Sequence, residues 1–455
     1  SRSVSIFDAR TGALVWDSGT SLQTIAVAAG TYNDGYFCTT EENIVDILPC
    51  DQAEQQYQAH TVRRLDQHAL IPGLINAHTH SAMSLFRGLA DDMPLMNWLN
   101  EHIWPAEGRW VHEEFIADGS KLAIAEMLRS GTTCFNDMYF YPDITARVAA
   151  SCGMRACVGL IVIDFPTVWA KDAGEYISKG LAVHDRFRGD SLVQTVFAPH
   201  APYTVSDQPL EHIRTLADEM DIGIHMHVHE TAEEVERAVE LTGKRPLQRL
   251  EELGLLTPAL MAVHMTQLGE GEIRRFADSG AHVVHCPESN LKLASGFCPA
   301  ATLAAAGINI ALGTDGAASN NDLDMIGEMR TAALLGKAVS GDASALPAHT
   351  VLRMATLNGA ATLGIAGETG SLTTGKWADI TAVRMDSLEA QPVYDPVSHL
   401  VYACGREQVS DVWVAGQQLL KERRLTTLDD HEIMHRARLW QERIGAANRT
   451  GHAGP

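Results

Sequence analysis

The sequence predicts a (β/α)8 barrel, an α/β fold, with a small β-sandwich formed from both ends of the chain. Between about residues 70 and 320, short β-branched or apolar runs alternate with longer helical stretches. Eight such runs can be counted, which favours a closed barrel over an open sheet. Both flanking regions carry short strand-like pieces separated by Gly, Asn and Asp turns, which is typical of a small antiparallel unit.

The barrel strands are expected at the eight apolar runs of the central region. These runs cover residues 74–77, 132–136, 155–162, 193–198, 223–228, 260–264, 281–285 and 308–313. Amphipathic helices are expected at 113–129, 230–253 and 322–336, where apolar residues recur at helical spacing. The apolar stripes of these helices should face the core.

The pattern divides the chain into four parts. Residues 1–68 should form the N-terminal part of the sandwich, with strands near 24–28 and 44–49, and residues 69–370 should form the barrel. Residues 371–425 should complete the sandwich with strands near 375–383 and 409–416. Residues 426–455 should form a C-terminal helix and tail.

Composition narrows the class of protein. A formal charge of −22 over 455 residues argues against nucleic acid or an anionic membrane as partner. The eight cysteines are scattered without a CxxC pair, which suits a reducing compartment. Since no run is apolar enough for a signal peptide or a membrane span, we expect a cytoplasmic protein and leave a homo-oligomer open.

Two histidines one residue apart follow the first strand, in Pro72-Gly73-Leu74-Ile75-Asn76-Ala77-His78-Thr79-His80. In an extended strand, side chains two residues apart share a face, so both imidazoles can point at one place. Imidazole is a common metal ligand. Taken alone, the pair fits an incidental surface or core pair equally well.

Later strands end in residues of the same chemical kind. His227 lies in the fifth, Asp315 follows the eighth, and His264 and His285 end the sixth and seventh. In such barrels the active site lies at the carboxyl ends of the strands. The first histidine pair, His227 and Asp315 would give three nitrogens and one oxygen, with room for a water, as in catalytic zinc sites.

Four motifs together resemble the amidohydrolase superfamily. They are Pro72-Gly73 leading to His78 and His80, His227-Val228-His229-Glu230-Thr231, Ser289-Asn290-Leu291-Lys292-Leu293, and Leu312 to Asn321 around Thr314-Asp315-Gly316. Within the superfamily they look like the 5'-methylthioadenosine/S-adenosylhomocysteine deaminases and the related triazine chlorohydrolases. The resemblance covers roughly residues 45 to 420.

The resemblance implies one zinc ion per subunit, bound by His78, His80, His227 and Asp315. These are the four residues that the strand positions also favour. Iron and manganese remain alternatives, because availability as well as affinity decides which metal fills a site.

The resemblance also assigns roles to residues outside the metal shell. Asp315 would accept a proton from water, and Glu230 would protonate the purine N1 and then the leaving ammonia. Both side chains would also contact the substrate. His264 would stabilise charge on the attacking oxygen. Glu107 would bind the ribose hydroxyls, and His200 would contact the substrate.

Each assignment has a structural alternative. Glu230 could be a helix-start carboxylate, His264 and His200 could be hydrogen-bonded core histidines, and Glu107 could be a solvated charge. For His225 and His229 we expect a buried role, either hydrogen-bonded or supporting the metal ligands, rather than ligation. The role of His285 stays open. Six apolar side chains near the first and third strands could enclose an alkylthio group: Met83, Leu85, Phe86, Trp98, Phe165 and Trp169. Such residues more often belong to the core, so we do not include them in the predicted site.

The leading interpretation is zinc-dependent hydrolytic deamination of a small adenine nucleoside. Methylthioadenosine is favoured over S-adenosylhomocysteine, because residues 159–166 contain Asp164 and no cation for an amino-acid tail. S-adenosylhomocysteine and adenosine stay open as further substrates. Alternatives are a deaminase of guanine, 8-oxoguanine or cytosine, a triazine hydrolase, and a non-catalytic barrel that binds a ligand. A cytidine-deaminase type of zinc site is excluded, because the chain has no PCxxC motif.

Overall fold

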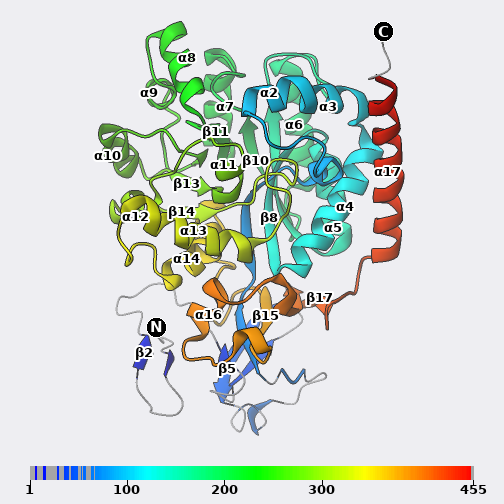
Figure 1. Ribbon diagram of the computed structural model, residues 1–455, viewed down its shortest axis with the longest axis vertical. Helices are drawn as coiled ribbons and strands as arrows, with labels where there is room; N and C mark the ends of the chain where they lie inside the picture. Colours follow the sequence, from blue (N-terminus) through cyan, green and yellow to red (C-terminus); the bar gives the residue numbers. More distant parts are fainter. Residues whose placement is uncertain are drawn as a thin grey trace. The chain divides into compact units, whose positions relative to one another are not determined.

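The computed structural model describes residues 67–451 continuously, and before them residues 6–7, 14–16, 28–29, 35–39, 42–49, 53, 55–57 and 63–65. The chain divides into two compact units. One comprises residues 77–126, 135–323 and 427–455, and the other comprises residues 1–76, 127–134 and 324–426. Figure 1 shows the elements in chain order.

Eight parallel strands follow one another in sequence order and form a barrel. They are β7 (Leu74–Thr79), β8 (Thr132–Tyr139), β9 (Arg155–Val162), β10 (Val193–Pro199), β11 (Ile224–Val228), β12 (Leu260–His264), β13 (His282–His285) and β14 (Ile310–Leu312). After β14, the N–H of Asp315 donates to the carbonyl of His78, with N and O 3.0 Å apart. This bond links the last strand to the first, and the predicted barrel is confirmed.

Burial on both faces explains why these strands read as nearly continuous apolar runs. Every residue of β9 and β12 is buried, including Gly159, where a side chain would collide with the backbone of Asp137. A parallel sheet whose outer face is covered by helices leaves no strand position to solvent. The helices α5 (Pro142–Cys152), α6 (Ala173–Phe187) and α7 (Asp207–Met220) pack outside β9 and β10 (Figure 1).

The prediction of one helix at 230–253 is wrong, because the structure has two helices in this range. They are α8 (Ala232–Thr242) and α9 (Pro246–Glu252). Gly243 takes a left-handed conformation with φ 74°, which ends α8, and Pro246 opens α9 at a position that needs no backbone N–H. The periodicity continues across the break, so the apolar pattern alone does not reveal it.

An irregular helical segment separates β7 from α4 (Glu113–Arg129), which has the predicted bounds. It contains η1 (Ser81–Phe86), α2 (Leu95–Asn97), a π-helical turn η2 (Trp98–Ile103) and α3 (Trp104–Trp110). π-helical turns are rare in proteins, and those that occur often lie at functional sites. This segment carries several residues of the cavity described below.

The second unit contains an antiparallel sheet built from both ends of the chain, as expected. Its strands are β3 (Ala28–Ala29), β6 (His68–Pro72), β15 (Ile380–Arg384), β16 (Val409–Val414), β17 (Gln417–Lys421) and β18 (Arg424–Leu425). The pair β4 (Gly35–Thr39) and β5 (Ile44–Pro49) is separate, and Ile44 packs with Leu372, Ala378 and Ile380. Most of the strand expected at 24–28 lies outside the described residues.

The helices of the second unit are α13 (Met325–Ser340), α14 (Ala348–Met354), α15 (Leu357–Thr362) and α16 (Pro396–Tyr402). Helix α13 begins three residues later than the expected 322–336 because the side chain of Asp324 caps it by accepting from the N–H of Ile326. A last helix, α17 (Asp430–Gly451), matches the helix expected at the C-terminal end. In the described part of the chain, no helix is long and apolar enough to cross a membrane.

Candidate active site

Three imidazoles and one carboxylate meet at the carboxyl ends of the barrel strands. His78 lies in β7 and His80 directly after it, His227 lies in β11, and Asp315 follows β14. Nε2 of His78 is 3.1 Å from Nε2 of His227 and 3.3 Å from Oδ1 of Asp315. Nε2 of His80 is 3.2 Å from the same carboxylate oxygen. The four donor atoms therefore converge on one point.

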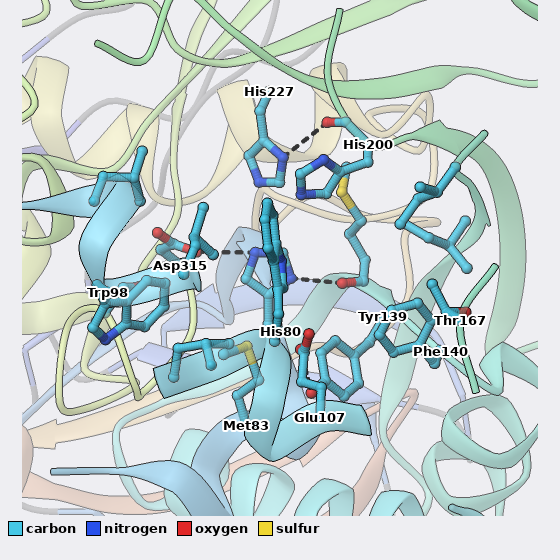
Figure 2. A pocket seen from close by; sticks show the side chains of 18 of the residues that line it. His80, Met83, Trp98, Glu107, Tyr139, Phe140, Thr167, His200, His227 and Asp315 are labelled. Carbon is cyan, nitrogen blue, oxygen red and sulfur yellow. Dashed lines mark hydrogen bonds and ion pairs between the residues drawn. The ribbon is translucent and has the colours of Figure 1, made fainter. Parts of the chain in front are cut away.

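The other ring nitrogen of each histidine is held by a neighbour. Nδ1 of His80 donates to the carbonyl of Met138 at 2.6 Å, and Nδ1 of His227 donates to the carbonyl of His200 at 2.9 Å; Figure 2 shows both bonds. A neutral imidazole that donates from Nδ1 keeps a lone pair on Nε2. These carbonyls thus turn the lone pairs toward the convergence point, as partners of metal-bound histidines do.

Burial and proximity set the charges of the cluster. Burial lowers the pKa of His78 to about 4 and that of His227 well below its usual value. Burial would also lower the pKa of His80, but Asp315 beside it outweighs this effect and raises it to about 9. In turn, bonds from His78 and His80 hold the pKa of Asp315 well below its usual value, against the effect of burial. A divalent ion would displace the proton that His80 and Asp315 share.

The donor set fits a divalent transition-metal ion. Two overlapping groups, His78 with His80 and Asp315, and His78 with His227 and His264, each have ligand atoms within 4.8 Å of one another. Neutral imidazole nitrogens and a carboxylate oxygen are the ligands that zinc takes in catalytic sites. His264 thus offers a donor atom to the cluster, in addition to the role expected for it.

Ser289 and Asn290, both in α11 (Pro287–Lys292), form hydrogen bonds with two side chains of the cluster. The hydroxyl of Ser289 donates to Oδ2 of Asp315 at 2.6 Å. Nδ1 of His264 donates to Oδ1 of Asn290 at 2.9 Å. His264 and Asp315 both take a left-handed backbone conformation, with φ 74° and 65°. Non-glycine residues are strained there, and such strain clusters at functional sites.

Glu230 lies beside the cluster in a buried position. Its carboxylate Oε2 is 3.9 Å from Nε2 of His264. Burial first, and then the negative charge of Asp315, raise the pKa of Glu230 to about 8. The carboxyl group is therefore neutral near pH 7 and can give a proton to a ligand in the cavity.

Glu107 is carried by α3 and paired with Tyr139 at the end of β8. The hydroxyl of Tyr139 donates to Oε1 of Glu107 at 2.7 Å. Burial raises the pKa of Glu107 to about 7, although the bond from Tyr139 lowers it. The pair faces the same cavity as His80 (Figure 2). Glu107 is thus no solvated surface charge.

His200 follows β10 and also faces the cavity. Its Nδ1 and the hydroxyl of Thr204 are 3.0 Å apart, and burial lowers the pKa of His200 to about 3. A neutral imidazole in this place can give or accept one hydrogen bond to a ligand.

A cavity of about 250 Å³ is lined by most of these groups, namely His80, Glu107, Tyr139, His200, His227, Glu230, His264 and Asp315. Among the described residues that line it there is no lysine or arginine; its acidic residues are Glu107, Glu230 and Asp315, and it also contains histidines. Away from the cluster the wall is apolar and consists mainly of Met83, Leu95, Trp98, Leu99, Ile103, Trp104, Phe140, Ile163, Phe165 and Val168.

Sequence reasoning left several of these cavity residues out. Met83, Trp98 and Phe165 line the cavity, whereas Phe86 packs on Phe115 in the core and Trp169 is buried against Tyr176. Tyr139, Ser289 and Asn290 were not singled out for a role. The strand-end rule could have pointed to Tyr139, since it is the last residue of β8.

The other three strand histidines, His225, His229 and His285, differ in what they contact. Nε2 of His229 accepts from the backbone N–H of Leu247 at 3.1 Å, which is a structural contact. His285 is buried and does not line the cavity. His225 touches His78, with 2.9 Å between Nε2 and Nδ1. Of the three, the described contacts connect only His225 to the cluster.

Comparison with known proteins agrees with this geometry. The sequence pattern of the amidohydrolase family matches residues 69–419. The chain belongs to the amidohydrolase family. It is 52% identical to a 5-methylthioadenosine/S-adenosylhomocysteine deaminase of Teredinibacter turnerae, over 91% of this chain and 94% of the relative. The predicted family, the predicted subgroup and the prediction of a hydrolytic enzyme are confirmed.

Solved structures give the same result for the fold. An adenosine deaminase of Xanthomonas campestris with bound zinc superposes with a TM-score of 0.90 at 52% identity, over 91% of this chain and 94% of that chain. An atrazine chlorohydrolase of Arthrobacter aurescens superposes with a TM-score of 0.82 at 23% identity, over 89% and 94% of the two chains. At that identity the second likeness concerns the fold alone.

Proposed function

We propose that this amidohydrolase deaminates an adenine nucleoside, and above all converts 5'-methylthioadenosine to S-methyl-5'-thioinosine and ammonia. The observation that carries the proposal is one cavity lined by two glutamates, Glu230, which is buried, and Glu107, which is half-buried. Glu230 adjoins the histidine and aspartate cluster, and Glu107 is held by Tyr139. Relatives named as deaminases of this nucleoside, at 52% identity, support the same reading.

Zinc is the metal we propose for the cluster, held by His78, His80, His227 and Asp315. The bound zinc in the Xanthomonas campestris adenosine deaminase supports this choice. When bound, zinc lowers the pKa of a coordinated water toward neutrality and so supplies hydroxide as the nucleophile.

The protein side chains move the protons. Asp315 is ionised and can accept a proton from the attacking water. Glu230, neutral near pH 7, gives its proton to N1 of the purine. The carboxylate so formed takes one proton of the attacking water and passes it to the leaving ammonia, and the other water proton, held by Asp315, restores Glu230. His264 keeps its Nδ1–H on Asn290 and presents Nε2 toward the attacking oxygen. Burial lowers the pKa of His264, so we propose that Nε2 carries a proton only transiently, taken from the attacking water, and then stabilises the charge on that oxygen.

Two groups would hold the nucleoside. The ionised Glu107 carboxylate can accept from two vicinal ribose hydroxyls, because Tyr139 binds Oε1 and no described residue donates a hydrogen bond to Oε2. His200 offers a hydrogen bond from the end of β10. We propose both as substrate contacts.

The apolar wall favours a short, uncharged 5' substituent. S-adenosylhomocysteine carries a charged amino-acid tail, and the described cavity residues include no cation to pair with its carboxylate. Burying such a charge without a partner is costly. Methylthioadenosine ends in an apolar methylthio group, which Trp98, Ile103 and Phe165 can enclose.

The test is ammonia release from methylthioadenosine, S-adenosylhomocysteine, adenosine, guanine and cytosine, with and without a chelator. We expect release from methylthioadenosine to exceed the others, to stop on chelation and to return with zinc. Release from a free base alone would support the alternative of a base deaminase, and no release from any adenosine compound would overturn the proposal.

We also place the reaction in the cytoplasm, because six cysteines are free and buried, namely Cys134, Cys152, Cys157, Cys286, Cys298 and Cys404. Free thiols persist where glutathione keeps them reduced. Fractionation of cells that express the full-length protein would test this location.

A further inference from the structure

His225 adjoins the metal-binding cluster without offering it a donor atom. It lies on β11 two residues before His227, so the two side chains share a face of the strand. Its Nε2 is 2.9 Å from Nδ1 of His78, and both side chains are fully buried. In the sheet order β7 is not a neighbour of β11, so this contact crosses the barrel interior.

The contact fixes where the protons are. Nε2 of His78 faces His227 and Asp315, so this nitrogen must keep its lone pair to bind a metal. The proton of His78 is then on Nδ1 and is donated to Nε2 of His225. His225 must in turn carry its own proton on Nδ1, since a neutral imidazole has one N–H.

This arrangement leaves a buried donor without an acceptor. Among the described residues, Nδ1 of His225 has no hydrogen-bond partner. An unpaired buried N–H destabilises the folded state, so a position like this is not explained by packing. Of the three histidines among the four proposed ligands, His80 and His227 use backbone carbonyls as acceptors, whereas His78 relies on a side chain that mutation can remove.

We propose that His225 is a positioning residue for His78, whose Nδ1–H it accepts so that the lone pair on Nε2 stays aimed at the metal. The inference rests on the metal site of the proposed function, but it does not depend on which substrate is deaminated. Partners of this kind affect metal affinity, and their loss typically weakens it by about 10- to 100-fold.

The test uses three substitutions of His225 and one matched control. His225→Phe keeps the ring volume and removes the acceptor, whereas His225→Gln places an amide oxygen near the position of Nε2. His225→Asn has an amide that is too short to reach His78. His285→Phe is the control, because His285 is also buried with an unpartnered Nδ1 but lies outside the cavity.

Two measurements report on the metal directly. Zinc affinity is measured by competition with a chromophoric chelator, and the cobalt-substituted protein is compared by its visible spectrum. We expect His225→Phe to lose zinc affinity by about 10- to 100-fold and to change the cobalt spectrum. We expect His225→Gln to recover most of the affinity and His285→Phe to keep native values. Melting of the metal-free proteins checks that each variant folds.

Several outcomes would overturn the inference. Native zinc affinity and cobalt spectrum in His225→Phe would do so, and so would an equal loss in His285→Phe, which would mean a general packing effect. If His225→Phe does not fold, equal affinities of the Gln and Asn variants would have the same consequence. Failure of the native chain to bind any metal would instead refute the metal site itself, and absence of deamination by a zinc-loaded native chain would refute only the substrate assignment.

Discussion

The two ends of the cavity are built in different ways. At the metal end, the side chains project from strands or from the residues directly after them, and His78 and Asp315 are 0% and 5% exposed. At the apolar end, the wall comes from α2, η2 and the segment after β9, where Phe165 is 41% exposed. One end is fixed by the barrel and the other by connecting segments.

This difference predicts a division of labour. Strand-borne groups are held in place by sheet hydrogen bonds, which suits chemistry that tolerates little displacement. Connecting segments accept sequence change more easily, which suits selection among substrates. Substitutions at the metal end should therefore lower kcat, whereas substitutions toward the apolar end should change KM or substrate preference.

The largest effect is expected for Glu230→Gln. The amide cannot transfer a proton, so kcat for methylthioadenosine should fall by about 10²- to 10⁴-fold. KM and zinc content should stay near native, because Glu230 is not among the four proposed ligands. Steady-state kinetics and metal analysis check this result. A kcat close to native would remove Glu230 from the proton transfer, because general acid–base catalysis contributes about 10²- to 10⁴-fold.

Glu107→Gln should have the next largest effect, on binding. Charge-assisted hydrogen bonds to two ribose hydroxyls are lost, so kcat/KM for nucleosides should fall by roughly 10- to 100-fold. Glu101→Gln is the matched control, because Glu101 lies on the preceding turn η2 and is exposed. If kcat/KM for methylthioadenosine is unchanged in Glu107→Gln, the carboxylate does not contact ribose and the nucleoside assignment loses its main support.

Tyr139→Phe should have a smaller effect that depends on pH. Loss of the hydrogen bond that holds Glu107 in place should raise KM by about 2- to 10-fold. Burial raises the pKa of Glu107 to about 7, so its carboxyl is neutral below that pH and ionised above it. Since only the ionised form accepts from both hydroxyls, KM should fall as pH rises through about 7. Tyr139 opposes the effect of burial, so its removal should move this inflection to higher pH.

Kinetics from about pH 5.5 to about pH 9, a range that brackets the expected inflection, would measure this shift. The double variant with Glu107→Gln is the control. Once the carboxylate is absent, Tyr139→Phe should add little, and an undiminished effect would show that Tyr139 acts independently of Glu107.

The smallest effect is expected for Phe165→Arg at the apolar end. A partly exposed cation there could pair with the carboxylate of S-adenosylhomocysteine, and such a pair improves kcat/KM by at most about fivefold. Phe165→Gln is the control, since it is polar but uncharged. An equal gain in both variants would show that polarity rather than charge limits the larger substrate, and the ratio of kcat/KM values for the two nucleosides measures the effect.

Elements with a strong local signal were predicted from the sequence. Strands β9 and β12 have the expected bounds because their residues are buried on both faces and read as apolar runs. The break between α8 and α9 was missed, because the apolar periodicity continues past Gly243. A local pattern reports which residues are apolar, and a left-handed glycine does not interrupt that pattern.

Contacts between residues far apart in the chain could not be predicted in the same way. Tyr139 is 32 residues from Glu107, and Asn290 is 26 residues from His264. Nothing in the local sequence of either pair specifies its partner. Those pairings follow from the strand order and from the direction in which each strand end points.

The sequence by itself determined the chemistry available to this protein. Two histidines at strand spacing, a third on the fifth strand and an aspartate after the eighth supply nitrogen and oxygen donors at one edge of a parallel barrel. Only the tertiary structure decided which imidazole nitrogens meet. His225 and His227 share a strand face, but His227 directs Nε2 at Nε2 of His78, whereas His225 reaches the opposite nitrogen of that ring. Alternation along a strand fixes the face of a side chain, whereas the position of the facing strand across the barrel fixes the atom that it touches.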